Sequence, residues 1–466
     1  MNKLIQFWET LRSSFWFMPS LMVAGSMAFA VVCIEADSTG NNPWLMSQWP
    51  RLFGVGAEGA RQMLSTLAGS MMTVMGITFS MTLLALVLAS GQYTSRILRN
   101  FMRSRITQFT LGTFAGIFAY CLIVLRTIRG TGGVDEFVPS LAVFFAFILS
   151  LCGVGVLIYF IHHIASSIQA SNIIASIAQE TNASIDRLLP AKQDQQPDAD
   201  ENRKQRLEAL DARQWYPIPA AISGYIQSID HDALLRLSRQ SRTIVRMEYG
   251  NGAFVVQNTA LLSLALTYPP DQKSIDAFHA AYSMGRYRTV EQDPAFGIRQ
   301  IVDIAIKALS PGVNDTSTAV ICVDYLTSIM ARLASRVFPP VYRYEGETLR
   351  VVAIVPNFEG LLAESFDQIR ASAEVNVAIL ARMLSAIDSI GSLTLRPDYL
   401  RALDEQLECI AELAARTIKA PHDRARLEMH LSKVRETLQI QPCIIPHRHH
   451  SPKLTLASIT MVQSGE

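Results

Sequence analysis

Charged residues are scarce in this sequence. Asp, Glu, Lys and Arg make up 17% of the 466 residues, against about 25% in soluble domains, and the shortfall is concentrated in the first 161 residues. Four stretches there contain no Asp, Glu, Lys, Arg or His: Phe15–Ile34, Leu64–Ala89, Thr107–Leu125 and Val138–Ile161. A helix of about twenty apolar residues covers the roughly 30 Å hydrocarbon core of a bilayer. The sequence therefore predicts an integral membrane protein with four transmembrane helices.

The same absence bears on function. Proton pumps and many coupled transporters bury carboxylates or histidines at membrane depth, so a proton-coupled transporter is disfavoured. The sequence also lacks Gly-x-Ser-x-Gly, His-Glu-x-x-His, a Walker loop and the Rossmann glycine fingerprint. No serine, cysteine or histidine stands out as part of a nucleophile–base pair. We predict no catalytic residue and no cofactor, and an enzyme acting on a lipid or an anionic metabolite is the least favoured class.

Cysteines are few and widely spaced. The six contain no Cys-x-x-Cys pair, so neither disulfides nor a zinc site is indicated. A possible metal cluster, Cys443 with His447, His449 and His450, lies in a tail that we expect to be disordered and that lacks a framework for a metal. The net charge of +1 gives no electrostatic case for nucleic acid as a partner.

Basic residues beside the four stretches predict their orientation. The loop from Ser90 to Ile106 has no acidic residue and four arginines, which are Arg96, Arg99, Arg103 and Arg105. Because loops rich in Lys and Arg stay on the cytoplasmic side, we expect the N-terminus and everything after Ile161 to be cytoplasmic. The bilayer is then the first partner of the chain.

The pattern along the chain divides it into five regions. We expect a four-helix transmembrane domain with an amphipathic helical extension over 1–189, a polar linker over 190–213 and a β-rich module over 214–268. A mainly helical domain with a β-hairpin follows over 269–439, and 440–466 is the tail. The predicted fold class is thus a membrane α-helical bundle carrying a cytoplasmic α+β part.

The β-rich module has short strand-like runs, glycine-containing turns and a helix from His231 to Gln240. It resembles the biotinyl/lipoyl type of β-sandwich. Those carriers need a lysine at a hairpin tip, and no lysine occurs from Gln205 to Gln272. We expect a structural or docking module. Farther along, a hairpin is expected around Glu345-Gly346-Glu347, and long helices over Phe358–Ile390 and Pro397–Leu438.

Small residues are frequent in the second and third stretches, including Gly112 and Gly116. Small residues let helices approach closely in a membrane, and two interpretations follow. One is packing within a single four-helix bundle. The other is a pore in a homo-oligomer, lined by Ser70, Thr73 and Ser80, with the four loop arginines at its inner mouth. Those arginines also fit a basic helical connection that reaches anionic headgroups, the interpretation that needs no pore.

The densest group of polar residues lies between Gly285 and Leu326. We expect a loop, a helix that starts at Pro294 and ends near Ser310, and a second helix capped by a side-chain oxygen. Arginine forks and helix N-termini favour carboxylate or phosphate, so one interpretation of the segment is an anionic-ligand site. The alternative is a buried network of ion pairs and caps that fixes this corner of the fold. The candidate residues are Arg288, Gln292, Asp293, Arg299, Asp303, Asn314 and Asp315.

Several segments resemble one known family. GSMMTVMGITFSMTLLALVLASGQYTSRILRNFMRSRITQFTLGTFAG, YFIHHIASSIQASNIIASIAQET, SGYIQSID and RTVEQDPAFGIRQIVDIAIKALSPGVNDTSTA are similar to the domain-of-unknown-function 2254 family of predicted bacterial membrane proteins. The resemblance covers about Leu11 to Leu438 and implies the same architecture in a bacterial inner membrane. It implies no particular activity.

Two functions remain in view from the sequence. The first is an oligomeric channel-like permeation protein, conducting an ion and gated by its cytoplasmic domain. The alternative is a membrane-anchored sensor or scaffold that binds an anionic ligand or a protein partner through the Arg288–Asp315 region.

Overall fold

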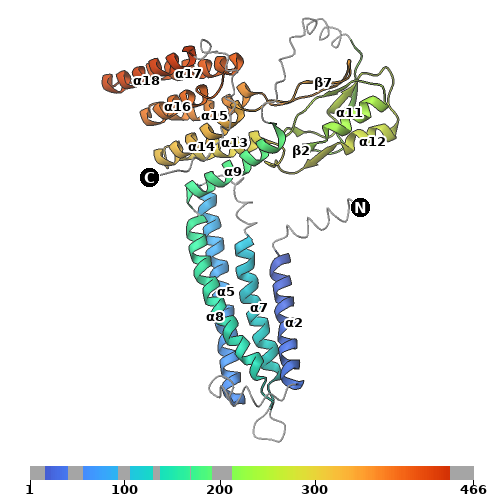
Figure 1. Cartoon of the computed structure of the whole chain (residues 1–466), viewed down its shortest axis with the longest axis vertical. Coiled ribbons are helices and arrows are strands. Elements are labelled where there is room, and N and C mark those ends of the chain that lie inside the picture. Colours follow the sequence, from blue (N-terminus) through green and yellow to red (C-terminus); the bar gives the residue numbers. More distant parts are fainter. Residues whose placement is uncertain are drawn as a thin grey trace, which may run out of the picture.

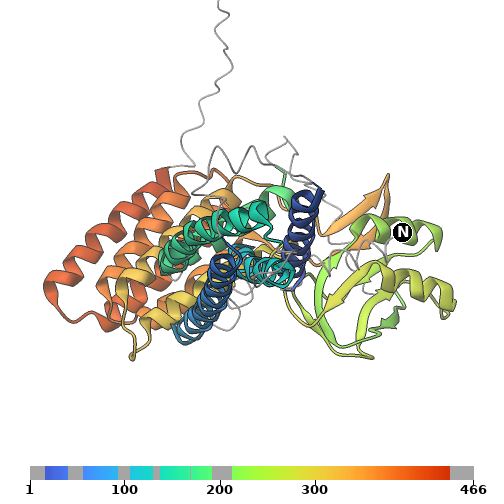
Figure 2. The ribbon, with the colours of Figure 1, turned by 90° about the horizontal axis from the view of Figure 1, so that it is seen from below.

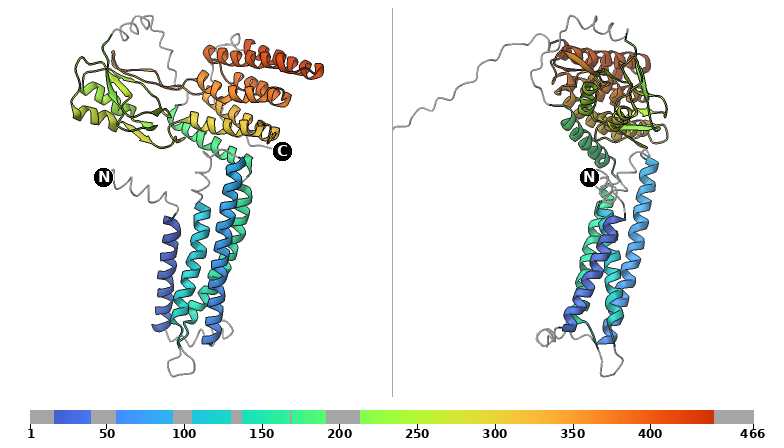
Figure 3. Two further views of the ribbon diagram at one scale, coloured as in Figure 1. Left: turned by 180° about the vertical axis from the view of Figure 1, so that it is seen from behind. Right: turned by 90° about the vertical axis from the view of Figure 1, so that its right-hand side faces the viewer.

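The computed structural model describes residues 16–39, 56–92, 105–129, 137–167, 169–190 and 213–440. A long helical bundle carries an α+β part at one end, as Figure 1 and the two views of Figure 3 show. Within the described ranges, five helices are long and apolar enough to cross a membrane. They are α2 (Phe17–Thr39), α5 (Ala57–Gln92), α7 (Arg105–Thr127), α8 (Ser140–Ser167) and α14 (Thr316–Ala334).

Helix α7 is the centre of the bundle and packs against α2, α5 and α8. Its two glycines permit the close approach of α2. A β-carbon at Gly112 would lie 2.7 Å from Sδ of Met22 and 3.0 Å from Cα of Pro19, and one at Gly116 would lie 2.5 Å from Oγ of Ser26. This pair therefore packs within the chain, as the first of the two interpretations expects.

At the bundle end far from the α+β part, α2 caps α8. The Asp37 carboxylate accepts hydrogen bonds from the backbone amides of Leu141 (3.2 Å) and Ala142 (3.1 Å), in the first turn of α8. The Tyr120 hydroxyl donates to the Ala142 carbonyl at 2.9 Å. The amides at a helix start have no partner within their own helix, so Asp37 satisfies two of them.

The amphipathic run from His162 to Leu189 forms two helices. Helix α8 ends at Ser167 and α9 spans Ala170–Leu188. The Asn172 side-chain amide donates to the Ser166 carbonyl at 2.7 Å, across the junction. Helix α9 packs against α13 (Pro294–Leu309) and α14, and Figure 1 shows it lying across the end of the bundle, beneath both helices. It is the direct connection between the bundle and the α+β part.

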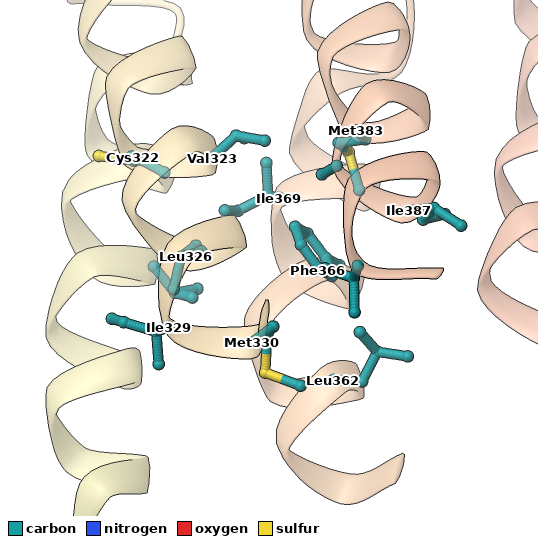
Figure 4. Packing of buried hydrophobic residues seen from close by; sticks show 14 of the residues in the cluster. Cys322, Val323, Leu326, Ile329, Met330, Leu362, Phe366, Ile369, Met383 and Ile387 are labelled. Atoms are coloured by element: carbon teal, nitrogen blue, oxygen red, sulfur yellow. The ribbon is translucent and has the colours of Figure 1, made fainter. Parts of the chain in front are cut away.

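The helical part is a stack of three helix pairs. These are α13 with α14, α15 (Phe358–Ala373) with α16 (Val377–Gly391), and α17 (Pro397–Thr417) with α18 (Pro421–Ile440). One apolar core runs through the stack and includes the buried face of α9. In Figure 4, Leu326 and Met330 of α14 lie beside Leu362 and Phe366 of α15. Helix α14 is thus part of this core, although its composition also suits a membrane.

The strands form two sheets, with α11 (His231–Gln240) and α12 (Gln272–Ala280) packed beside them. The first sheet has the order β1 (Tyr216–Pro219), β5 (Ala260–Leu264), β3 (Val245–Met247), β8 (Thr348–Val352) and β7 (Tyr342–Glu345). The second has the order β4 (Phe254–Val255), β2 (Gly224–Ile229) and β6 (Tyr282–Gly285). Figure 2 shows the sheets on one side of the bundle axis and the helical stack on the other.

The biotinyl/lipoyl-like sandwich expected within 214–268 is not confirmed. Of the eight strands that the structure describes, three (β6, β7 and β8) come from beyond residue 268. The hairpin expected in the helical region joins the first sheet instead, because β8 pairs in parallel with β3, with Val351 opposite Val245. The sequence does not reveal this pairing because it depends on contacts between residues far apart in the chain. The predicted linker and tail lie largely outside the described residues.

Candidate ligand cavity between the sheets and the helical stack

A cavity of about 870 Å³ lies where the sheets meet the helical stack. Its wall is built from the end of α9, the junction of β2 and α11, the β3–β4 turn, the loop before α13, strand β7 and the segment between β8 and α15. Pockets of 300–1,000 Å³ that combine an apolar wall with a few polar groups are the usual sites of small ligands.

One wall of the cavity is a buried ion pair. Arg288 donates from Nε (2.9 Å) and Nη2 (2.7 Å) to one oxygen, Oδ2, of Asp293, whose side chain is 6% exposed. Burial raises the pKa of Asp293, and the Arg288 guanidinium opposes that shift. The guanidinium also lies over the Phe296 ring, 5.1 Å from its centroid. The charge of Arg288 is therefore largely neutralised within the protein.

The loop before α13 is held on two sides. The Asn251 side-chain amide donates to the Gln292 carbonyl at 3.0 Å, from the β3–β4 turn. The Ser184 hydroxyl of α9 donates to the Glu291 carbonyl at 3.1 Å. This loop thus joins the sheet, the cavity and the helix that connects to the bundle.

Arg343 on β7 is the unusual side chain of the cavity. It is half-buried, and its Nε is buried without a hydrogen-bond partner. Its side chain forms no ion pair or hydrogen bond with any residue that the structure describes. Burial lowers the pKa of Arg343, and the nearby Asp232 carboxylate raises it. An arginine keeps its charge even when it is partly buried, so a cation faces the cavity without an ion pair.

The first turn of α11 lies beside Arg343. Asp230 caps the helix by accepting from the Ala233 amide at 2.8 Å. Burial, and secondly the charge of Arg343, lower the pKa of His231 to about 4, so its ring is neutral at pH 7. Asp232 is exposed and lies at the cavity. The first turn of α13, with Pro294 and Ala295, also faces the cavity.

The predicted anionic-ligand residues are divided among three places. Arg288, Gln292 and Asp293 line the cavity. Arg299 and Asp303 do not; they form an ion pair on the side of α13 with Nε 2.9 Å from Oδ1, and Nη1 of Arg299 lies 3.6 Å from Glu364 on α15. This second group fits the alternative, an internal ion-pair network.

Asn314 and Asp315 lie at the other end of α13. Asp315 caps α14 by accepting from the Thr318 amide at 3.0 Å, and Asn314 has a φ of +48° in the turn. The same end is joined to the next helix pair, because Asn376 donates to the Thr316 hydroxyl at 2.9 Å. These two residues therefore shape a turn that is separated from the cavity by the length of α13, about 24 Å for its 16 residues.

The predicted pore residues lie on the outer surface of the bundle. Ser70, Thr73 and Ser80 are exposed on α5, and the Thr73 hydroxyl donates to the Gly69 carbonyl at 3.0 Å. Within one chain they line no interior space that the structure describes. Arg105 is exposed at the start of α7, whereas Arg96, Arg99 and Arg103 lie outside the described residues.

Sequence reasoning missed Arg343, His231 and Asn251. The β7–β8 hairpin was expected to stand apart from the β-rich module, and nothing local to Arg343 reports that β7 reaches the cavity. A weak signal was available for His231, because Asp230 and the helix start beside it could be read from the sequence.

Several long apolar helices with an attached α+β part that holds this cavity define the class: a predicted membrane protein. The chain belongs to the family of predicted membrane proteins DUF2254, whose model matches residues 12–389. Uncharacterized proteins of Mycobacterium bovis (strain ATCC BAA-935 / AF2122/97) and Mycobacterium tuberculosis (strain ATCC 25618 / H37Rv) are 28% identical to it over 471 residues, covering 98% of this chain and 86% of each relative. No solved structure matches it significantly.

Proposed function

We propose that this chain is a membrane-anchored sensor that binds a small anionic ligand in the cavity between its sheets and its helical stack. The observation that carries the proposal is Arg343, a half-buried cation with no ion-pair partner among the described residues, in a cavity of about 870 Å³. Taking a charge out of water is costly unless it is paired. A bound anion would supply the missing partner.

The helices around the cavity support the same sign of ligand. Residues of the first turns of α11 and α13 line it, and the N-terminal end of a helix carries a partial positive charge. Asp293, before α13, is paired with Arg288 and therefore adds little net negative charge. Asp230 caps α11 and offsets part of the field of that helix, so the start of α13 gives the stronger support. Asp232 opposes an anion, so its removal should tighten binding.

The membrane topology is part of the proposal. Helices α2, α5, α7 and α8 cross the bilayer, while α14 packs in the core of the helical stack between α9, α13 and α16. The arginine-rich segment 96–105 supports a cytoplasmic position for the N-terminus and the α+β part, because loops rich in Lys and Arg stay on that side. Membership of a family found in bacteria agrees with the inner membrane.

Helix α9 offers a route from the cavity to the membrane. Its C-terminal residues, Leu188 and Leu189, line the cavity, while its other end follows α8 directly. Arg336, which follows α14, bonds both the Leu189 carbonyl (3.3 Å) and the Asp186 carboxylate. A ligand that displaces the end of α9 would therefore change how the α+β part sits on α8. Such coupling requires that the ligand bind the two arrangements with different affinity.

The test uses the full-length protein in nanodiscs. A panel of anions, from inorganic phosphate to organic carboxylates and nucleotides, is screened at constant ionic strength for a rise in melting temperature, and hits are titrated by calorimetry. Arg343→Gln should weaken a hit by about tenfold or more, because a charged hydrogen bond contributes about 1.5–3 kcal/mol. Asp232→Asn should strengthen it. Arg435→Gln, which breaks an exposed ion pair with Glu408 on the outermost helix pair, should change nothing. A panel without any hit, or equal binding by Arg343→Gln, would contradict the proposal.

A channel is the second candidate, and one observation favours it. Gly69, Thr73, Gly76 and Ser80 form an exposed face of small residues on α5, and no described atom lies within 4 Å of a β-carbon built on either glycine. Such a face suits contact with α5 of other copies, and a homo-oligomer would bring Ser70, Thr73 and Ser80 around a common axis. Cysteine-accessibility labelling at Thr73 and Ser80 tests it: slow labelling by a charged thiol reagent means lipid or protein surrounds them.

A further inference from the structure

We infer that the ligand of the cavity is an amphipathic anion, in which a carboxylate or phosphate is attached to an apolar body. This inference rests on the proposed function and adds the chemical class of the ligand. A single small anion occupies only a small fraction of about 870 Å³. The remaining wall shows what else the cavity accepts.

Much of that wall is apolar. Leu188 and Leu189 end α9, Ile354 and Val355 follow β8, and Leu361 lies in the first turns of α15. Ile354 lies in the segment that connects β8 to α15, and its side chain is 46% exposed. A ligand that covers this aliphatic side chain should gain about 25 cal/mol of binding free energy for each Å² of apolar surface removed from water.

The polar groups come from other elements. Arg343 is on β7, His231 on α11 and Asn251 in the β3–β4 turn. His231 is neutral at pH 7 because burial and Arg343 lower its pKa to about 4, so the positive side chain not engaged in an ion pair is Arg343. The lining therefore provides one place for an anionic head and a separate set of side chains for an apolar body.

The β3–β4 turn meets the apolar set at one point. A β-carbon at Gly250 would lie 3.1 Å from both Cγ2 and the carbonyl oxygen of Ile354. The adjacent Asn251 donates to the Gln292 carbonyl. The turn thus holds the segment after β8 beside the loop that carries Arg288, and polar and apolar groups share one cavity rather than two.

The test is a chain-length series on the full-length protein in phosphatidylcholine nanodiscs. Acetate, butyrate, hexanoate and octanoate, and the matching alkyl phosphates, are titrated by calorimetry, with empty nanodiscs subtracted to remove partitioning into lipid. We expect Kd to fall about fourfold for each added methylene, which corresponds to about 0.8 kcal/mol per buried CH₂. The preferred head group then distinguishes a carboxylate from a phosphate source.

Two variants separate the head from the body. Arg343→Gln should weaken every member of a series by a similar factor, whereas Ile354→Ser should flatten the dependence on chain length and leave acetate unchanged. Leu393→Ser is the matched control, because Leu393 is 61% exposed in the turn after α16 and does not line the cavity.

The possible failures differ. Equal affinity for acetate and octanoate would overturn the amphipathic ligand and leave the anion sensor standing. Octanol binding as tightly as octanoate, with no effect of Arg343→Gln, would overturn the anion and with it the proposed function. No binding by any member in either series, together with an empty anion panel, would overturn both.

Discussion

A β-carbon at Gly252 would lie 2.1 Å from Oδ2 of Asp293 and 2.8 Å from Nη2 of Arg288. The glycine also has a φ of +79°, which other residues rarely adopt. The Arg288–Asp293 pair is therefore seated directly on the backbone of the β3–β4 turn. Gly252→Ala should lower the free energy of unfolding by at least about 2 kcal/mol, because strain and overpacking add. Thermal unfolding in nanodiscs measures the loss.

Gly346 provides the control for Gly252. Its φ is +58°, but no described atom lies within 4 Å of its β-carbon position. Gly346→Ala should therefore cost only the backbone term, about 1 kcal/mol. Equal losses in the two variants would mean that the ion pair moves freely away from the turn.

The contact between α9 and α13 should be equally sensitive. A β-carbon at Gly297 would lie 1.9 Å from Oγ1 and 3.0 Å from Cβ of Thr181. Gly297→Ala should destabilise the protein by about 1–3 kcal/mol, measured by thermal unfolding. Thr181→Ala removes the clashing hydroxyl and should recover part of that loss in the double variant, as a double-mutant cycle would show. Additive losses would place the two residues in separate contacts.

The elements that local patterns determine were largely predictable. The helix at His231–Gln240, the end of α13 near Ser310 and the side-chain oxygen that caps α14 all occur in the structure. Each depends on residues within one or two turns of the position. The family was also recognisable, because its motifs are continuous in the sequence.

Features that depend on pairing between strands far apart in the sequence were not predictable. The parallel contact between β3 and β8 brings Arg343 to the cavity, and no property of the hairpin itself reports it. Arg299 and Asn314 show the opposite error. They were grouped with Arg288 because they are close in sequence, but Arg299 lies on the side of α13 and Asn314 lies beyond its C-terminal end. A run of polar residues on a helix extends along its length, so sequence proximity overstates how closely they gather.

The pH dependence of stability should show the burial of His231. Its pKa in the folded protein is about 4, below the ordinary 6.5. The unfolded chain therefore takes up a proton first as pH falls from about 7 to 4, and the folded state loses stability over that window. The melting temperature of the wild type should fall more between pH 7 and pH 4.5 than that of His231→Gln. Parallel curves would mean that the ring is accessible to water.

The two small-residue faces of the bundle should respond differently to a large side chain. Gly112 lies against α2, and a β-carbon there would lie 3.0 Å from Cα of Pro19 and 2.7 Å from Sδ of Met22. Gly112→Leu should therefore lower the free energy of unfolding by about 2 kcal/mol or more. Gly76 has no described atom within 4 Å of its β-carbon position, so Gly76→Leu should leave the single chain as stable as the wild type. If α5 contacts other copies, as the proposed homo-oligomer requires, Gly76→Leu should instead shift native mass spectra from oligomer to monomer. A wild type that is already monomeric, or an oligomer unchanged by Gly76→Leu, would mean that this face of α5 contacts lipid. The pore would then lose its only geometric support, because Thr73 and Ser80 lie on the same face.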